Sequence, residues 1–504
     1  MFKPIALYWA DGYKVGHYMM LAPGTRKLYG TWIPRNIKHA PKGIRKIMSF
    51  GQQLTVRWLN ENFKECFFAL PPSCVEQFGK DMSLYLGLPY EYGHFTELYN
   101  LGYLPIRVKA LPEGIETNPN IPHATFINTV DGFAWLTLYL ETIFSALSWK
   151  ASTSATIAKQ YNRNTTEWVM KTCPSMAFLI PFLNHDFSAR GMDPYSMMTS
   201  GLGHATSSRG SDTLIVIPAA RHYYDEPEDS VAINSVNASE HSVSTTKIFT
   251  VGESQMLADW IKLFPKGILS IVSDTFDLWK LITMYLVANK QAIMDREGTL
   301  VVRPDSGDPV DIICGTNREL RPDLDPTYEN AVGKGVVELL WDIFGGTIVT
   351  GGDGKQYKVL DSHIGSIYGD SINLDRQIQI FERLAEKGFA CCNVVLGVGS
   401  FTYQFNTRDT LGYAAKGAWF TVLNEDGTTS EFDIYKEPIT DDGGKVCLRG
   451  RVAVHIDEHG EYVVQQHCTA EEEAGGILQT IFEDGKYYNQ TTLAAVRERV
   501  AALA

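Results

Sequence analysis

The sequence lacks several features that would assign it to a specialised class of protein. Its eight cysteines include no CxxC pair, and two of them, Cys391 and Cys392, are adjacent. Buried free thiols in a reducing compartment, the cytoplasm, are therefore expected. The chain contains no low-complexity tract and no sequence repeat. A cluster of glycines at Gly351–Gly354 is not followed by GK[ST], so it predicts a turn or hairpin and not a phosphate loop.

Membrane and secretion signals are also missing. The N-terminal residues 1–11 have neither the apolar core nor the cleavage site of a signal peptide. The most apolar long stretch, residues 133–149, contains Glu141 and is shorter than the roughly 20 residues needed to cross a bilayer. This stretch predicts a buried amphipathic helix, and no membrane partner is expected.

Positive charge is scarce as well. With 45 Lys and Arg against 58 Asp and Glu, the formal net charge is −13, which argues against nucleic acid as a partner. A small anionic substrate is still compatible, because it needs only a local group of Arg and Lys. The hydrophobic share of 44% and the charged share of 20% are those of an ordinary globular protein. A length of 504 residues predicts two domains.

What the sequence does contain is a pattern that recurs through its middle. A short β-branched run ends in Asp, Arg or Gly, and a loop and a predicted helix follow. The pattern occurs at residues 267–274, 299–307, 363–370 and 392–400. Uninterrupted apolar runs that alternate with helices are typical of buried parallel strands, in an α/β barrel or a doubly wound sheet. In such folds the reacting groups lie past the carboxyl ends of the strands. Arg, Asp and Gly at those ends suit a phosphorylated sugar.

Strand-like alternation indicates a second domain formed by both ends of the chain. Residues 27–32 and 106–110 near the N-terminus, and 451–456 and 461–465 near the C-terminus, alternate in this way. Turns at residues 425–427, 442–444 and 483–485 predict hairpins. We divide the chain into an N-terminal part of the flanking domain (1–145), an α/β core (146–400) and a C-terminal part of the flanking domain (401–504).

Several polar motifs lie near the predicted strand ends, and each can be explained by a structural role without any function. Residues 303–309, RPDSGDP, have the composition of a turn. Arg303 could nevertheless bind a phosphate, and Asp305 could bind ribose hydroxyls. A His-Asp pair such as His185-Asp186 is usually structural. His241 could cap a helix, but a loop histidine also suits proton or phosphoryl chemistry. The GxG at 397–399 is weak by itself, so no single motif decides the function.

Together, and in their order, these motifs carry a resemblance. The chain resembles the nicotinamide phosphoribosyltransferase family of type II phosphoribosyltransferases over nearly its whole length. The matching segments are ADGYKVGHY at 10–18, HDFSARG at 185–191, GSDT at 210–213, ASEHS at 238–242, SIVSDTFD at 270–277, VVRPDSGDP at 301–309, YGDSIN at 368–373, GVGS at 397–400, TRDTLGYAAK at 407–416, and the region of Lys436 and Gly450-Arg451. The resemblance implies an irregular (β/α) barrel core with a flanking β-rich domain built from both chain ends. Residues 347–359 align poorly, and we expect a surface loop there.

The resemblance implies a reaction in which nicotinamide attacks C1 of 5-phosphoribosyl pyrophosphate and pyrophosphate leaves. It implies that Phe187 and Tyr13 sandwich the pyridine ring, with Tyr13 supplied across the interface of a homodimer. Asp212 is expected to accept a hydrogen bond from the carboxamide. Arg303 and Arg190 are expected to hold substrate groups near the pyrophosphate and the base.

The resemblance also implies the remaining members of the substrate site. The expected contacts are Asp305, Gly369 and Asp370 with ribose and nucleotide; Gly399, Ser400 and Arg408 with the 5′-phosphate; Lys416 and Lys436 with phosphate from the partner subunit; and Ser235 and Ser270 elsewhere in the substrate site.

His241 and Asp305 are the expected catalytic residues. In this family a histidine at the position of His241 is phosphorylated when ATP is hydrolysed, and the added charge favours the forward reaction. ATP is thus expected as an optional coupling substrate. The expected cofactor is Mg²⁺, held by Asp274 and Asp305 through metal-bound water.

Two other functions stay open on the sequence alone. One is the related nicotinate phosphoribosyltransferase, which shares the fold and the chemistry. Asp212 speaks against it, because a carboxylate attracts an amide donor and repels the carboxylate of nicotinate. The other is a non-catalytic binding or regulatory relative that keeps the nucleotide pocket. Against this stands the presence of every charged position that the chemistry requires.

Overall fold

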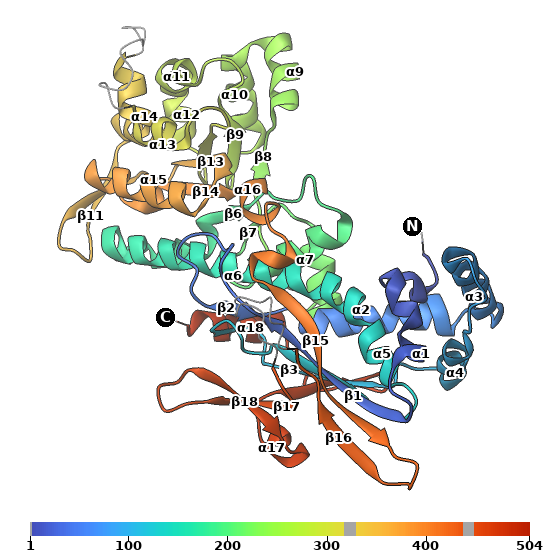
Figure 1. Cartoon of the computed structure of the whole chain (residues 1–504). Coiled ribbons are helices and arrows are strands. Elements are labelled where there is room, and N and C mark those ends of the chain that lie inside the picture. The colour runs from blue at the N-terminus through green and yellow to red at the C-terminus, as the bar shows by residue number, and fades with distance from the viewer. Residues whose placement is uncertain (1–2, 317–328, 437–447, 504) are drawn as a thin grey trace.

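A sheet of parallel strands forms the core of the molecule in the computed structural model, which describes residues 3–316, 329–436 and 448–503 (Figure 1). The strand order is β7-β6-β14-β13-β10-β9-β8, and every pair of neighbours is parallel. The strands are β6 (Asn184–Asp186), β7 (Gly210–Ser211), β8 (Asn237–Ala238), β9 (Leu269–Val272), β10 (Leu300–Arg303), β13 (Ile364–Ile372) and β14 (Val394–Val398).

The two edges of this sheet meet through one short segment, residues 234–238. Asn234 bonds to the β7 edge, donating its N–H to Arg209 O at 2.7 Å and accepting the Ser211 N–H at 3.1 Å. A few residues later Asn237 and Ala238 pair with β9 at the other edge. The sheet therefore curls back on itself, which confirms the irregular barrel and excludes the open doubly wound alternative.

The barrel strands form because their apolar residues are buried on both faces. Ile271 and Val302 are fully buried in one core cluster, together with Leu396 and Val398 of β14. This burial explains the uninterrupted apolar runs of the sequence. The helices between and around these strands are α7 (Pro194–Ala205), α8 (Val216–Tyr224), α9 (His241–Val251), α10 (Glu253–Leu263), α11 (Leu278–Lys280), α12 (Lys290–Met294), α13 (Pro309–Cys314), α14 (Glu329–Phe344), α15 (Leu374–Glu386) and α16 (Ser400–Tyr403).

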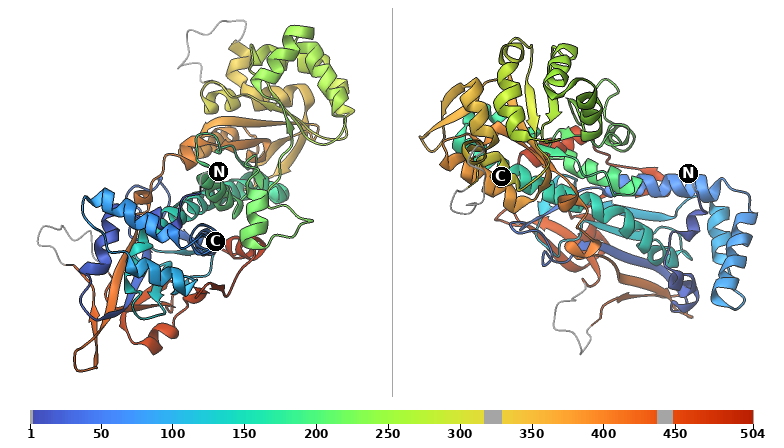
Figure 2. Two further views of the ribbon diagram at one scale, coloured as in Figure 1. Left: turned by 90° about the vertical axis from the view of Figure 1, so that its right-hand side faces the viewer. Right: turned by 90° about the horizontal axis from the view of Figure 1, so that it is seen from above.

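A second, antiparallel sheet combines the two ends of the chain, as predicted. Its order is β16-β15-β1-β5-β3-β19-β20, and Figure 2 shows the blue N-terminal and orange-red C-terminal strands together. The pairing of β1 with β15 places Trp32 beside Ala415, so residues far apart in the sequence are neighbours. The strands are β1 (Thr25–Pro34), β3 (Ile106–Ala110), β5 (Ala124–Asn128), β15 (Tyr413–Leu423), β16 (Thr429–Asp433), β19 (Gln479–Glu483) and β20 (Lys486–Tyr487).

Shorter elements complete the flanking domain. Two small sheets pair β2 (Ile47–Ser49) with β4 (Ile115–Thr117) and β17 (Arg451–Ile456) with β18 (Tyr462–Cys468). Its helices are α1 (His17–Met20), α2 (Gln52–Phe63), α3 (Ser73–Leu86), α4 (Gly93–Leu101), α5 (Ala134–Tyr139), α17 (Ala470–Ala474) and α18 (Leu493–Ala501).

A long helix, α6 (Glu141–Thr172), runs between the two sheets (Figure 1). Its buried residues contribute to the barrel core through Tyr161 and to the flanking core through Phe144. The helix also crosses the expected division at residue 145. The boundaries at 145 and 400 stay predictions.

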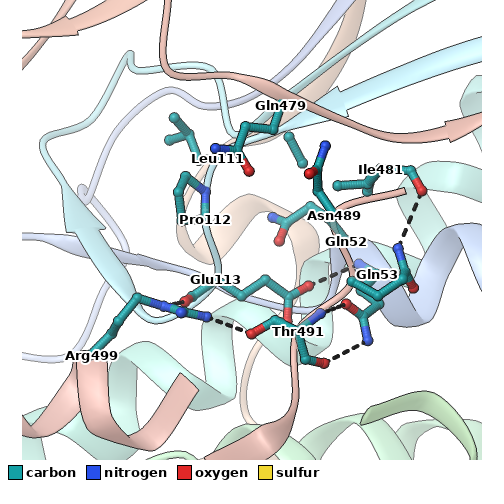
Figure 3. A pocket seen from close by; sticks show the side chains of 12 residues that line it. Gln52, Gln53, Leu111, Pro112, Glu113, Gln479, Ile481, Asn489, Thr491 and Arg499 are labelled. Carbon is teal, nitrogen blue, oxygen red and sulfur yellow. Dashed lines mark hydrogen bonds between the residues drawn. The ribbon is translucent and has the colours of Figure 1, made fainter. Parts of the chain in front are cut away.

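Hydrogen bonds tie the C-terminal segment to the start of α2 (Figure 3). The Glu113 carboxylate accepts the N–H groups of Gly51 and Gln53 at 3.0 and 2.8 Å. The Gln53 side chain accepts the Thr491 N–H at 2.8 Å, and Arg499 donates to the Glu113 carbonyl at 2.6 Å. These residues surround a cavity of about 280 Å³, so both chain ends are fixed to one another.

Smaller predictions from the sequence have mixed outcomes. Helices α5 and α6 cover the apolar stretch at 133–149, and hairpins form at 425–427 and 483–485. The turn at 442–444 lies outside the described residues. Residues 347–359 form a hairpin of β11 (Gly346–Thr350) and β12 (Gln356–Leu360), with its turn at the predicted glycine cluster. The segment lies at the surface as expected, since β11 is mostly exposed, but it consists of two paired strands and not of a loop.

Two further properties concern the described part of the chain. All seven cysteines within it are free thiols, and six of them are buried, in agreement with the expectation. None of its helices combines the length and the apolar content needed to cross a bilayer.

The contact of α6 with α7 requires a glycine, which gives a first prediction. A Cβ on Gly203 would lie 2.7 Å from the Ala151 carbonyl oxygen and 2.8 Å from the Ala155 nitrogen, both in the backbone of α6. We expect Gly203→Ala to lower the free energy of unfolding by about 1–3 kcal/mol, because rigid backbone must move. Chemical denaturation measures this change.

The matched control is Gly93 in α4, where a Cβ would meet nothing within 4 Å. Gly93→Ala should be neutral or stabilise by about 0.4–1 kcal/mol, since alanine restricts the unfolded chain. Equal effects of the two substitutions would contradict the proposed close contact between α6 and α7.

Candidate active site

Residues at or just after the ends of six strands, β6, β7, β8, β10, β13 and β14, surround one open cavity of about 690 Å³. Parallel strands bring their carboxyl ends to the same edge of a sheet, so residues far apart in sequence meet there. Ten of the predicted site residues line this cavity. They are Phe187, Arg190, Asp212, His241, Arg303, Asp305, Gly369, Asp370, Gly399 and Ser400.

A second cavity, of about 420 Å³, lies beside the first and is lined mainly by apolar side chains. The predicted residues Ser235 and Ser270 line this one. The two cavities share Phe187, Asp212, Ala238 and Arg303. Ala238 and the three larger side chains therefore form the wall between a polar and an apolar compartment.

The loop after β6 is held in place by Asp186, which is fully buried. Its carboxylate accepts the Ser188 N–H at 2.9 Å and the Thr213 hydroxyl at 2.8 Å. Its carbonyl accepts the Asp212 N–H at 3.0 Å, while the Phe187 N–H donates to Val398 O at 2.9 Å. Asp186 thus fixes Asp212 directly and holds the loop that carries Phe187, the two residues that the family resemblance assigns to the base.

The carboxylate of Asp212 receives two hydrogen bonds on one oxygen. His185 Nε2 lies 3.0 Å from Oδ1, and the Ser235 hydroxyl donates to the same atom. Burial alone would raise the pKa of Asp212, but these two donors outweigh it and hold the pKa below its usual value. Asp212 is therefore an anion at neutral pH.

Arg303 lies at the end of β10 with its side chain only 14% exposed. Its guanidinium carbon lies 6.0 Å from the centre of the Phe187 ring, and Nη2 lies 3.8 Å from Asp305 Oδ2. Among the described residues, its buried Nε has no hydrogen-bond partner. A guanidinium placed in this way can bind an anion beside an aromatic ring.

The carboxylates of Asp274, Asp305 and Asp370 lie close to one another and near Arg303. The Asp305 N–H donates to Asp274 Oδ2 at 2.8 Å. Burial raises the pKa of Asp305, and the neighbouring carboxylates of Asp274 and Asp370 raise it further, against the opposing effect of Arg303 and His241. A cation would relieve this repulsion.

His241 begins α9 and faces the cavity with its side chain 44% exposed. Its Nε2 lies 3.5 Å from Asp274 Oδ1, and its Nδ1 lies 3.4 Å from the Thr275 hydroxyl. The imidazole is thus both accessible and oriented by a carboxylate, a combination typical of a reacting histidine.

An irregular stretch of β13 directs Gly369 and Asp370 into the cavity. The register shifts between Tyr368 and Ile372, and Ser371 has a positive φ of 52°, as in bulges that aim residues at a site. A Cβ on Gly369 would lie 2.3 Å from Asp305 Oδ1. A side chain at this position would displace the Asp305 carboxylate.

Four of the predicted substrate contacts do not line either cavity, and neither does Asp274, which lies next to Asp305 and His241. The four substrate contacts are Tyr13, Arg408, Lys416 and Lys436. Tyr13 is 66% exposed, Arg408 lies 3.0 Å from Asp409, and Lys416 lies 3.3 Å from Glu141. Within one chain, the structure does not bring them to the strand ends.

Other residues of the site escaped the sequence analysis. Ser239, Glu240 and Ser306 line the polar cavity, and they lie within or next to recognised motifs. Gln404 donates to the carbonyls of Ser188, at 2.8 Å, and Arg190. It joins the segment after β14 to the loop after β6, and no sequence signal marks it, because its partners are backbone atoms.

Comparisons with known proteins agree with this arrangement. A model of the nicotinate phosphoribosyltransferase (NAPRTase) family matches residues 182–486. The nicotinamide phosphoribosyltransferase of Acinetobacter baylyi is 39% identical over 97% of this chain and 96% of that protein. The protein of the same name from Xanthomonas campestris pv. campestris is 31% identical over 80% of this chain and 80% of that protein. The one from Mycoplasma pneumoniae is 29% identical over 86% of this chain and 92% of that protein.

Two solved structures share the fold at 15% sequence identity. Human nicotinic acid phosphoribosyltransferase superposes with a TM-score of 0.55, and the match covers 97% of this chain and 92% of the human chain. Nicotinate-nucleotide pyrophosphorylase from Pyrococcus furiosus has a TM-score of 0.54 and covers 98% and 95%. The family model alone matches more than half of the chain. This chain therefore belongs to the nicotinate phosphoribosyltransferase family, together with relatives named nicotinamide phosphoribosyltransferase.

Proposed function

We propose that this protein transfers the phosphoribosyl group of 5-phosphoribosyl pyrophosphate to nicotinamide, giving nicotinamide mononucleotide and pyrophosphate in NAD salvage. The names of its sequence relatives support this function. The observation that carries it is the anionic Asp212 on the wall shared by the two cavities, next to Phe187 and Arg303. A carboxylate in this position is an acceptor for the carboxamide of the base.

The chemistry is a displacement at C1 of the ribose. The lone pair of the pyridine nitrogen forms the new N–C1 bond, and the C1–O bond electrons leave with pyrophosphate. Positive charge develops on the sugar and negative charge on the leaving group, so catalysis consists of orientation and electrostatic stabilisation. Phe187 stacks on the ring, Asp212 orients it through the carboxamide, and Arg303 binds anionic oxygens.

Asp305, Gly369 and Asp370 lie where the ribose would rest, and Gly399 and Ser400 receive the 5′-phosphate. A Cβ on Gly399 would meet nothing within 4 Å, so open space exists there for a ligand. Ser235, Ser270 and Arg190 complete the substrate contacts. Asp305 serves as a catalytic residue because its carboxylate faces the developing positive charge of the sugar.

The carboxylates of the cavity also fit Mg²⁺. Asp274 Oδ1 is buried and receives no hydrogen bond from the described residues, although His241 Nε2 lies 3.5 Å away. Burial, and then the acidic neighbours, raise the pKa of Asp305. No group of three His, Cys, Asp or Glu side chains in that part of the chain could hold a metal by itself. Asp274 and Asp305 would therefore hold the ion through its water shell, and Mg²⁺ would neutralise pyrophosphate charge.

The nicotinate enzyme is the alternative that the family name raises. Nicotinate would bring its carboxylate against the anionic Asp212, at a repulsive cost. A non-catalytic relative is disfavoured because the Arg, Asp and His side chains of the site all face one cavity.

We expect the unmodified protein to use nicotinamide and to use nicotinate poorly. Asp212→Asn should narrow this preference, because it removes the charge that repels nicotinate while keeping an acceptor for the carboxamide. Initial rates with each base, 5-phosphoribosyl pyrophosphate and Mg²⁺ measure the effect. Equal turnover of the two bases by the unmodified protein would contradict the proposed preference for nicotinamide.

We also infer a homodimer in which Tyr13, Lys416 and Lys436 complete the site of the partner subunit. The support is that these residues lie outside both cavities, and that Tyr13 and the nearby Met19 and Met20 are all exposed apolar side chains. The reducing cytosol is the proposed compartment, supported by the free cysteines. Arg408 stays a proposed 5′-phosphate contact that the conformation of this single chain does not place at the cavity.

A mixing experiment tests the shared site. Tyr13→Ala and Arg303→Ala chains should each be nearly inactive alone. Mixed and allowed to exchange, they should regain about a quarter of full activity, because each heterodimer contains one intact site. The measurement is activity after mixing, with sedimentation to establish the assembly. A fully active monomer would exclude the composite site.

ATP coupling rests on His241, which is exposed to the cavity and oriented by Asp274. A phosphoryl group on its imidazole would add roughly 1.5–2 negative charges near Arg303 and the Mg²⁺-bound substrate. His241→Ala should lose ATP hydrolysis and the ATP-dependent gain in product, while weak basal synthesis persists. The check is product yield with and without ATP, and undiminished stimulation would show that His241 is not the acceptor.

A further inference from the structure

The contact between His185 and Asp212 shapes the base site in a way that the reaction alone does not require. His185 is on β6 and Asp212 follows β7, so two neighbouring strands present them side by side. His185 Nε2 lies 3.0 Å from Asp212 Oδ1. A carboxylate can only accept, so the hydrogen of this bond belongs to Nε2.

The His185 ring is held in one orientation. Its centre lies 4.6 Å from that of Phe187 at an interplanar angle of 34°. On the other side, a Cβ on Gly210 would lie 2.9 Å from Nδ1, so the backbone of β7 approaches this edge closely. Both neighbours restrict the ring, and the direction of the Nε2–H bond is fixed with it.

This bond decides which oxygen of Asp212 is available. Oδ1 receives both His185 and the Ser235 hydroxyl, whereas Oδ2 receives no hydrogen bond from the described residues. The Asp212 side chain is 43% exposed and lines both cavities. One anionic oxygen is therefore left for a ligand.

We propose that His185 is a positioning residue that holds Asp212 as an oriented anionic acceptor, and that it thereby sets the preference for a carboxamide over a carboxylate on the base. This inference rests on the proposed transfer to nicotinamide. His185 acts through Asp212 and touches no reacting atom.

A purely structural role for His185 is the competing explanation. The hydrogen bonds that join the loops after β6 and β7 belong to its neighbour, Asp186, which binds Ser188, Ser211 and Thr213. The His185 side chain, by contrast, has one hydrogen bond among the described residues, the one to Asp212. Changing His185 should leave the joined loops intact.

Two amide substitutions separate the roles. The amide of His185→Gln reaches about as far as Nε2, while that of His185→Asn reaches only as far as Nδ1. Both side chains are polar and smaller than the ring, so they should affect folding alike. Ser235→Ala removes the other donor to Oδ1. For all three variants, KM and kcat are measured with nicotinamide and with nicotinate, and KM with 5-phosphoribosyl pyrophosphate.

We expect His185→Asn to raise KM for nicotinamide about tenfold or more, the scale of a lost hydrogen bond to a charged group. Its kcat should change less, and its nicotinamide-to-nicotinate ratio of kcat/KM should fall by a similar factor. His185→Gln should recover most of that ratio. Ser235→Ala should lower the ratio in the same direction, and KM for 5-phosphoribosyl pyrophosphate should be unaffected.

The inference is overturned if His185→Asn keeps the ratio of the unmodified protein. It is also overturned if the Asn and Gln variants lose activity equally with both bases and melt at equally lowered temperatures, because that pattern indicates a structural role. Failure of the unmodified protein to use nicotinamide would instead refute the proposed function, before any variant is compared.

Discussion

The buried carboxylate of Asp186 is the interaction on which the base site depends. It lies at the end of β6 without exposure to solvent and accepts hydrogen bonds from the Ser188 backbone and from the hydroxyls of Ser211 and Thr213. Hydrogen bonds to a charged group contribute about 1.5–3 kcal/mol each, and a buried carboxylate that loses them costs more than they contributed. The loops after β6 and β7 are therefore tied together, and Phe187 and Asp212 project from them into a common space. Base recognition begins with a group that touches no substrate.

The division into two compartments follows from the same geometry. Phe187, Asp212 and Arg303 separate an apolar cavity from a polar one rich in Asp, Arg and backbone groups. A flat neutral ring and a highly charged sugar phosphate need opposite surroundings. Their reacting atoms must nevertheless meet within van der Waals distance. A shared wall with a ring-stacking face, an anion and a guanidinium meets both demands.

The sequence predicted the long strands because burial on both faces leaves a readable mark. The runs around Ile271, Val302 and Val398 are mainly apolar, and each forms a barrel strand. The strands β7 and β8 have two residues each, too few for any periodicity, so the positions of Asp212 and His241 came from the family resemblance. In the sequence His185 is adjacent to Asp186, and such a pair favours a structural interpretation. The partner of His185, Asp212, is close only across the parallel strands. Tyr13 and Lys416 could not be placed at the site by one chain, since the proposed contact needs a second copy.

The central claim is that the shared wall binds the base and the strand ends bind the sugar phosphate. A crystal structure of the protein with nicotinamide mononucleotide tests it most directly. The account predicts the pyridine ring against Phe187, the carboxamide nitrogen within hydrogen-bond distance of Asp212 Oδ2, and the 5′-phosphate next to Gly399 and Ser400. A mononucleotide bound with its carboxamide turned away from Asp212, or bound outside the two cavities, would contradict it.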